Sequence, residues 1–272
     1  MIASDLPAYR LDLQYLGTSF LGWQSQPQGT AVQDHLEKAL STMLRHPVRV
    51  TGAARTDTGV HAEQQVAVFR TAVAYDERKW LKSLQGLLPP SVGVASIRTV
   101  GSDFHPILSA QAKVYRYRLW LGVTRNPLIA PFAWQIVSDL DVTAVAEAAR
   151  DFVGLHDFTS FCAIDSTAKT RQREIYEVVV EQQGPLVDIW VSGSGFLKQM
   201  VRTMVGTLVD VGLGKRDAKS LPAVLAAKDR QAAGMTAPAL GLSLVQICYG
   251  ERPTVAELRT RLSAGFCVKL WP

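Results

Sequence analysis

Cysteine is scarce in this sequence, and its spacing excludes the usual cysteine-based scaffolds. The 272 residues include only Cys162, Cys248 and Cys267, and no two of them form a CxxC pair. An odd number of widely spaced cysteines is untypical of a disulfide framework or a zinc ribbon. The five histidines form no HExxH motif. We therefore expect reduced cysteines, a cytoplasmic protein and no metal site.

Long apolar runs are also missing, which argues against a membrane partner. The most apolar stretch, residues 196–213, is interrupted by Lys198, Arg202 and Asp210, so it does not read as a membrane-spanning helix. The first ten residues, MIASDLPAYR, lack the apolar centre of a secretory signal.

The composition is that of a globular protein with a modest basic excess. Hydrophobic residues make up 47% and charged residues 19% of the chain, which suffices for a sizeable core in one large domain or two ordinary ones. The formal net charge of +5 favours an anionic partner. A merely soluble basic protein has the same charge, so this observation alone does not decide the function.

Hydrophobic spacing predicts an α+β protein. Alternating apolar residues predict strands at 9–15 and 109–121, apolar residues at helical spacing predict a helix at 31–45, and residues 196–212 are apolar almost all round, as in a buried helix. Strands and helices follow in a similar order in both halves. We expect two similar lobes, residues 1–108 and 109–272, with mixed, largely antiparallel sheets flanked by helices.

The stretch ARTDTGVHA at 53–61 contains Asp57-Thr58-Gly59, the triplet of aspartic proteases. Those enzymes need two carboxylates that share a proton, and this chain has no second such triplet. The nearby Arg55 favours the charged carboxylate, which opposes proton sharing. An aspartate that stays ionised serves as nucleophile or general base; the alternative is an ion pair that only pins the loop.

The residues around Asp57 closely resemble the catalytic loop GRTDAGVHA of the tRNA pseudouridine synthase A family. Further resemblances follow in order along most of residues 9–250. They are Phe20-Leu21-Gly22-Trp23-Gln24, Thr30-Ala31-Val32-Gln33, Phe104-His105 with Ser109-Ala110 and Tyr115-Arg116-Tyr117, Gly154-Leu155-His156-Asp157-Phe158, Gly195-Phe196-Leu197 with Met200-Val201-Arg202, and Ala237-Pro238-Ala239 with Gly241-Leu242.

This resemblance implies a pseudouridine synthase fold with an active-site cleft between the lobes. It implies an isomerase that breaks the N1–C1′ bond of a uridine in the anticodon stem-loop of tRNA (positions 38–40), turns the base and rejoins it through C5. Family members need no cofactor or metal, and act as homodimers with the tRNA lying across both subunits. A rival interpretation is an RNA-binding paralogue of the same fold that is weakly active or inactive.

The resemblance assigns Asp57 as the catalytic carboxylate. It leaves open whether Asp57 attacks C6 of the base, attacks C1′ or removes a sugar proton. Arg55 then either orients Asp57 or fills the space that the flipped nucleotide leaves in the RNA. Arg202 lies in an otherwise apolar helix, where a guanidinium needs a carboxylate partner; the resemblance makes Asp57 that partner, with Asp210 or solvent as the alternative.

The resemblance also predicts the substrate-binding residues. Tyr115 matches the tyrosine that stacks on the target base, whereas Tyr117 is expected in the core. Leu242 or Leu244 forms an apolar wall in this interpretation, and either is as easily a core residue. His61 contacts RNA or caps the turn, with neither favoured.

The sequence also contains basic residues that could meet phosphates, and a few positions that differ from the family motifs. The side chains spaced to meet phosphates are Arg116, Arg118, Lys169, Arg171 and Arg173. Ala54 stands where the family has Gly, Thr58 where it has Ala, and Pro106-Ile107 where it has Ala-Arg. If position 54 requires positive φ, Ala54 is strained by about 1 kcal/mol.

Overall fold

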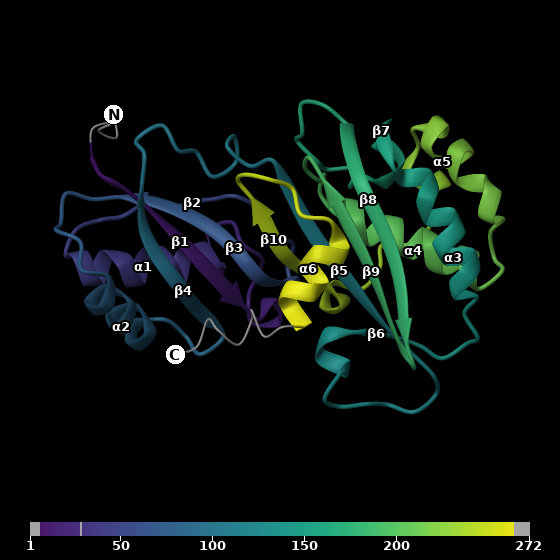
Figure 1. Ribbon diagram of the computed structural model, residues 1–272, viewed down its shortest axis with the longest axis horizontal. Helices are drawn as coiled ribbons and strands as arrows, with labels where there is room; N and C mark the ends of the chain where they lie inside the picture. The colour runs from purple at the N-terminus through teal and green to yellow at the C-terminus, as the bar shows by residue number, and fades with distance from the viewer. Residues whose placement is uncertain (1–5, 28, 264–272) are drawn as a thin grey trace. The chain divides into compact units, whose positions relative to one another are not determined.

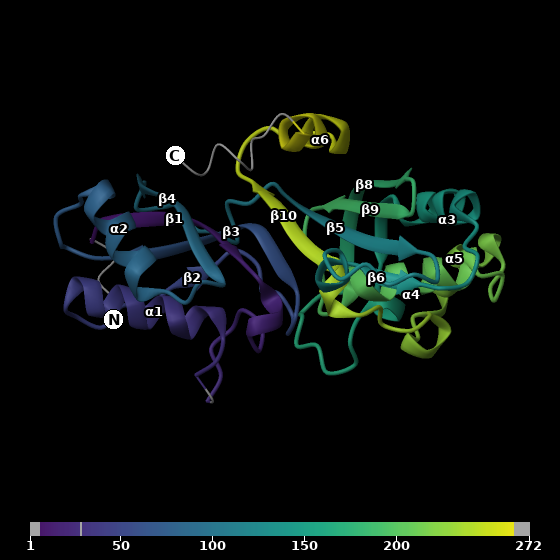
Figure 2. The same ribbon diagram turned by 90° about the horizontal axis from the view of Figure 1, so that it is seen from below.

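The computed structural model describes residues 6–27 and 29–263, which form two compact units (Figures 1 and 2). The first unit contains the described residues up to Gln111 together with Leu244–Glu251. The second contains Ala112–Ser243 and Arg252–Arg259. None of the described helices is both long enough and apolar enough to cross a membrane.

The first unit is built on an antiparallel sheet. Strand β1 (Ala8–Tyr15) lies between β3 (His61–Arg70) and β4 (Val92–Val100) and is antiparallel to both. Strand β10 (Leu242–Cys248) follows β3 in the strand order, and the short β2 (Thr51–Gly52) also pairs with β3.

Helices α1 (Val32–Leu44) and α2 (Glu77–Leu87) provide the core of this unit with their apolar sides. Trp80 of α2 meets the ring of Tyr9 edge-on at 5.1 Å, and Tyr9 stacks on Phe69 at 5.5 Å. The helix predicted at 31–45 is confirmed, and the rings show that the apolar face of β1 points toward α2.

The second unit is also built on a mainly antiparallel sheet with helices beside it (Figure 1). Its strand order is β5 (Ala112–Leu121), β9 (Leu186–Gly193), β8 (Gln172–Gln183) and β7 (Gly154–Asp157), with antiparallel neighbours. The short β6 (Trp134–Ile136) pairs with β5 in parallel. The prediction of mixed, largely antiparallel sheets flanked by helices is confirmed.

Four helices belong mainly to this unit: α3 (Val142–Ala149), α4 (Met200–Gly212), α5 (Leu221–Ala227) and α6 (Val255–Ser263). The predicted helix at 196–212 begins four residues too early, because Gln199 adopts a left-handed φ of 61° and ends the preceding loop. Short 3-10 turns occur at Gly17–Ser19, Ala130–Phe132, Arg150–Phe152, Thr159–Phe161, Ala218–Ser220, Arg230–Ala232 and Ala239–Gly241.

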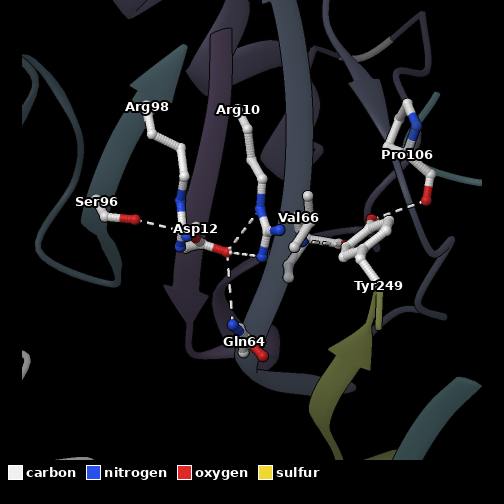
Figure 3. A network of polar contacts seen from close by, with 9 residues as sticks. Arg10, Asp12, Gln64, Val66, Ser96, Arg98, Pro106 and Tyr249 are labelled. Atoms are coloured by element: carbon white, nitrogen blue, oxygen red, sulfur yellow. Dashed lines mark hydrogen bonds and ion pairs between the residues drawn. The ribbon is translucent and has the colours of Figure 1, made fainter. Parts of the chain in front are cut away.

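A buried carboxylate joins three strands of the first unit (Figure 3). On β1 itself, Asp12 accepts a hydrogen bond from Arg10 at 2.6 Å. It also accepts from Arg98 at 2.5 Å and Ser96 at 2.7 Å on β4, and from Gln64 at 3.4 Å on β3. Burial by itself would raise the pKa of Asp12, but the charge of Arg10 and the hydrogen bonds from Ser96 and the two arginines outweigh it and hold the pKa below the ordinary value of 3.8. The network therefore stabilises the fold while Asp12 is ionised.

We predict that Asp12→Asn lowers the free energy of unfolding at pH 7 by about 2 kcal/mol, because it strands two guanidinium groups beside a neutral amide. A lowered carboxyl pKa contributes stability above its unfolded value and loses it as pH falls through the folded one. The difference from wild type should therefore shrink below about pH 3.8. Urea titrations at several pH values measure it, with the exposed Asp139→Asn as control; equal losses in both variants would contradict the prediction.

Candidate active site

Asp57 lies on a tight turn just before β3. The Val60 N–H donates to the Asp57 carbonyl at 3.1 Å, and Gly59, the third residue of the turn, has a φ of +81°. A turn with positive φ at this position favours glycine there and accepts most residues before it. Thr58 is that preceding residue, and it is exposed. Its departure from the family pattern is therefore compatible with the same turn.

A buried hydrogen-bond network connects the loop of Asp57 to strands β1 and β3. The Tyr15 hydroxyl lies 2.8 Å from Thr56 Oγ1, and Gln65 Nε2 donates to that hydroxyl at 3.4 Å. Burial raises the pKa of Tyr15 to about 12, against the lowering effect of its bonds to Thr56 and Gln65. Gln65 also donates to the Ala54 carbonyl at 2.7 Å and accepts from the Ala54 N–H at 3.2 Å. The side chains of β1 and β3 thus hold both the start and the middle of the loop.

Glycines allow the neighbouring main chain to approach this loop closely. A Cβ on Gly17 would overlap the Val60 carbonyl, and a Cβ on Gly22 would lie 2.8 Å from the Thr56 carbonyl oxygen. Trp23 is 2% exposed, and its main-chain N–H donates to that same Thr56 carbonyl at 3.1 Å. The segment around Gly22 and Trp23 therefore braces the loop, and Trp23 is a packed residue.

His61 and Ala54 both prove to be structural neighbours of the loop. His61 is 5% exposed, and its Nδ1 accepts the Gly17 N–H at 3.2 Å. This bond ties the start of β3 to the segment after β1, and a contact of His61 with RNA stays a prediction. Ala54 is not among the described non-glycine residues with positive φ, so the strain considered for it does not arise.

We predict that Gln65→Met lowers the free energy of unfolding by about 2 kcal/mol, because it leaves the buried N–H and C=O of Ala54 without a partner. Gln64→Met is the matched control, since the half-buried Gln64 makes only a 3.4 Å contact with Asp12. Denaturant titrations of both variants test this. Equal destabilisation by the two substitutions would show that the Ala54 bonds are not the cause.

Tyr115 lies on β5 in the second unit and is largely buried. The ring of Phe196 meets it edge-on, with centroids 5.0 Å apart at an interplanar angle of 81°. Lys113 lies two residues earlier on the same face of the strand. Burial, together with the charge of Arg173, lowers the pKa of Lys113 to about 8. An aromatic ring and two basic groups therefore gather at this end of β5.

Arg202, in the first turn of α4, is oriented by the main chain of a distant loop. Its Nε donates to the Ala237 carbonyl at 2.8 Å, and the Ala237 N–H donates to the Arg202 carbonyl at 3.1 Å. The next residue, Pro238, accepts the Tyr117 hydroxyl at 2.8 Å. Burial raises the pKa of Tyr117 far above its usual 10.0, although the charge of Arg202 opposes this. Tyr117 is the core residue expected, and it holds the loop that orients Arg202.

The predicted site residues thus fall into two groups, one in each unit. Arg55 and Asp57 lie on one loop of the first unit and His61 begins the strand β3 that follows it; Tyr115, Arg202 and Leu242 lie in the second unit. Leu242 is 5% exposed and Leu244 is fully buried, so both side chains are buried in the structure, and an apolar wall formed by Leu242 stays a prediction. Among the residues that the structure describes, no group of three or more His, Cys, Asp or Glu is placed to hold a metal ion.

Sequence reasoning missed the residues that support these groups. Gln65 and Tyr15 are the clearest examples, because each bonds the loop of Asp57. Phe196 belongs to a segment that the resemblance singled out, but its contact with Tyr115 was not predicted. The sequence did contain one sign of the role of Gln65, because a glutamine beside the apolar residues of β3 needs hydrogen-bond partners if it is buried. Nothing in the local pattern distinguished Tyr15 from other inward-facing residues of β1.

The first unit thus carries a carboxylate on a braced turn, and the second carries an aromatic ring beside cations and a guanidinium that donates to a main-chain carbonyl. A family model described as tRNA pseudouridine synthase matches residues 13–107 and 148–250. The chain belongs to this family.

Relatives named tRNA pseudouridine synthase A match most of the chain. The protein of Geobacter sp. (strain M21) is 43% identical over 243 residues, covering 89% of this chain and 98% of the relative. Those of Myxococcus xanthus and Geobacillus kaustophilus (strain HTA426) are 43% and 40% identical, covering 91% and 90% of this chain and 94% and 96% of the relatives. A solved structure described as a Cbf5-Nop10-Gar1 complex aligns with 87% of this chain and 48% of that chain, at 12% identity and a TM-score of 0.36, a likeness too weak for comparing folds.

Proposed function

We propose that this protein isomerises uridine to pseudouridine in the anticodon stem-loop of tRNA, with Asp57 as the catalytic carboxylate. The observation that carries the proposal is the match to tRNA pseudouridine synthases along nearly the whole chain. It is supported by the rigid turn that presents the half-buried Asp57. A carboxylate that is held in place loses little freedom when it meets the substrate.

The reaction is an isomerisation, so its atoms balance without a co-reactant. The N1–C1′ bond breaks, a C5–C1′ bond forms, a proton leaves C5 and N1 takes up a proton. Oxidation and reduction are not involved, and the chemistry calls for no redox cofactor. Asp57 acts by attack on C6, by attack on C1′ or by removal of a sugar proton.

The other site residues bind and orient the nucleotide in this proposal. Tyr115 stacks on the target base, since a base taken out of its helix needs an aromatic or apolar face. Leu242 supplies an apolar wall. Arg55, exposed beside Asp57, occupies the space that the flipped nucleotide leaves or orients the carboxylate. Arg202 is the carboxylate's partner, and His61 shapes the turn.

The remaining partners follow from the same proposal. The net charge of +5 suits a polyanionic substrate such as tRNA. We infer a cytoplasmic homodimer with tRNA bound across both subunits. Sedimentation of the free protein as a monomer at micromolar concentration would contradict the dimer.

We predict that the wild type forms pseudouridine in an unmodified tRNA transcript and that Asp57→Ala loses at least about a thousandfold in rate while tRNA binding persists, because only the catalytic carboxylate is removed. Base-resolution mapping of pseudouridine and filter binding measure the two effects, with the exposed Asp139→Ala as control. A wild type that binds tRNA without product would identify an inactive RNA-binding protein. Pepstatin-sensitive peptide cleavage would identify a protease.

We predict that Arg202→Met lowers the turnover number by about a hundredfold or more with a smaller change in KM, since it removes a charge that orients the carboxylate. Arg216→Met is the matched control, because Arg216 also donates to a main-chain carbonyl of the second unit, that of Ala232, at 2.9 Å. Single-turnover kinetics of both variants decide the matter. Equal turnover in both would rule out a special role of Arg202.

A further inference from the structure

The loop between β7 and β8 carries the most exposed large apolar side chain of the described chain, Ile164, at 86% exposure. A single exposed apolar residue on a surface is ordinary. Ile164 differs because hydrogen bonds and one ion pair hold the loop on both sides of it, so the main chain presents the side chain to solvent at a defined position.

Arg171, the last residue of this loop, forms hydrogen bonds to residues across it. Its guanidinium donates to Cys162 Sγ at 2.7 Å and to the Ser166 carbonyl at 3.0 Å, and its own carbonyl accepts the Phe158 N–H at 3.0 Å. These bonds engage Arg171 in holding the loop, although its spacing suggested a phosphate contact. The loop is therefore a preformed element.

The two neighbours of Ile164 are tied to the segment that follows β9. The Ala163 N–H donates to the Lys198 carbonyl at 3.0 Å, and the Asp165 carboxylate pairs with Lys198 Nζ at 2.6 Å. Two residues before Lys198, the Phe196 ring contacts Tyr115. A short chain of contacts within the second unit thus links Ile164 to the tyrosine proposed to hold the target base.

Basic residues occur in the loop of Ile164, at the start of β8 and in the segment bonded to the loop. Lys169 follows Ile164 in the loop and Arg173 lies at the start of β8. Lys198 pairs with the neighbouring Asp165, and Lys113 is near enough to Arg173 for that charge to lower the pKa of the lysine. Asp165 is the acidic residue within the loop. An apolar side chain amid cations fits an unpaired RNA strand, in which phosphates meet the cations and a base face meets the apolar group.

We propose that Ile164 packs against a base of the RNA strand next to the nucleotide held at Tyr115, while Lys169 and Arg173 contact the adjoining phosphates. This inference rests on the proposed function and assigns the β7–β8 loop as a rim of the substrate site. It makes Ile164 a residue for substrate binding and positioning, with no part in bond making.

The test compares Ile164→Ala, Ile164→Leu and the control Leu155→Ala, which truncates another exposed side chain, 67% exposed on β7. With an unmodified tRNA transcript, Ile164→Ala should raise KM about tenfold, as the loss of a buried aliphatic contact predicts. Its turnover number should stay within about twofold. Ile164→Leu should restore most of the affinity, and Leu155→Ala should match the wild type.

Equal KM values for wild type and Ile164→Ala, or an equal rise in Leu155→Ala, would overturn the proposal. Filter binding of the same transcript to the four proteins gives a second measurement that needs no turnover. If the wild type makes no pseudouridine but Ile164→Ala binds tRNA about tenfold more weakly, the proposed reaction fails and the RNA contact stands. If the wild type is active and binding is unaffected by Ile164→Ala, the contact fails and the reaction stands.

Discussion

The amide of one buried side chain, Gln65, determines where the loop of Asp57 begins. It donates to the carbonyl of Ala54 and accepts from the N–H of the same residue, so a side chain of β3 takes the place of a pairing strand. Buried main-chain groups require such partners. The same amide also reaches the hydroxyl of Tyr15, which bonds Thr56. The position of Asp57 therefore depends on a residue outside the candidate site.

Space around the loop matters as much as hydrogen bonding. Gly17 and Gly22 let the chain between β1 and α1 pass so close that a Cβ at either position would collide with the carbonyls of Val60 or Thr56. Gly59 supplies the positive φ that the turn requires. Close packing of this kind leaves the main chain of the loop little freedom, and a carboxylate on a rigid support is better placed for chemistry than one on a mobile loop.

The sequence predicted what local patterns determine and missed what depends on distant contacts. Alternation and helical spacing placed β1 and α1, and the catalytic-loop motif singled out Asp57. The start of α4 was wrong because Gln199 adopts a left-handed conformation more usual for glycine or asparagine. The return of β10 to the sheet of the first unit has no local signal. The bond from Arg202 to Ala237 has no local signal either, since an arginine in an apolar helix indicates that a partner is needed but does not identify it.

Side chains of β5 alternate between the two faces of the sheet, and the two sets make different contacts. Lys113 and Tyr115 lie on one face with Tyr117, whereas Arg116 and Arg118 point to the other. Arg118 makes a bidentate pair with Asp188, and Arg116 lies 5.3 Å from the ring of Trp190. Two of the arginines whose spacing suggested phosphate contacts thus interact within the sheet. If RNA binds this unit, its charge must be met on the other face, where Lys113 and Arg173 accompany Tyr115.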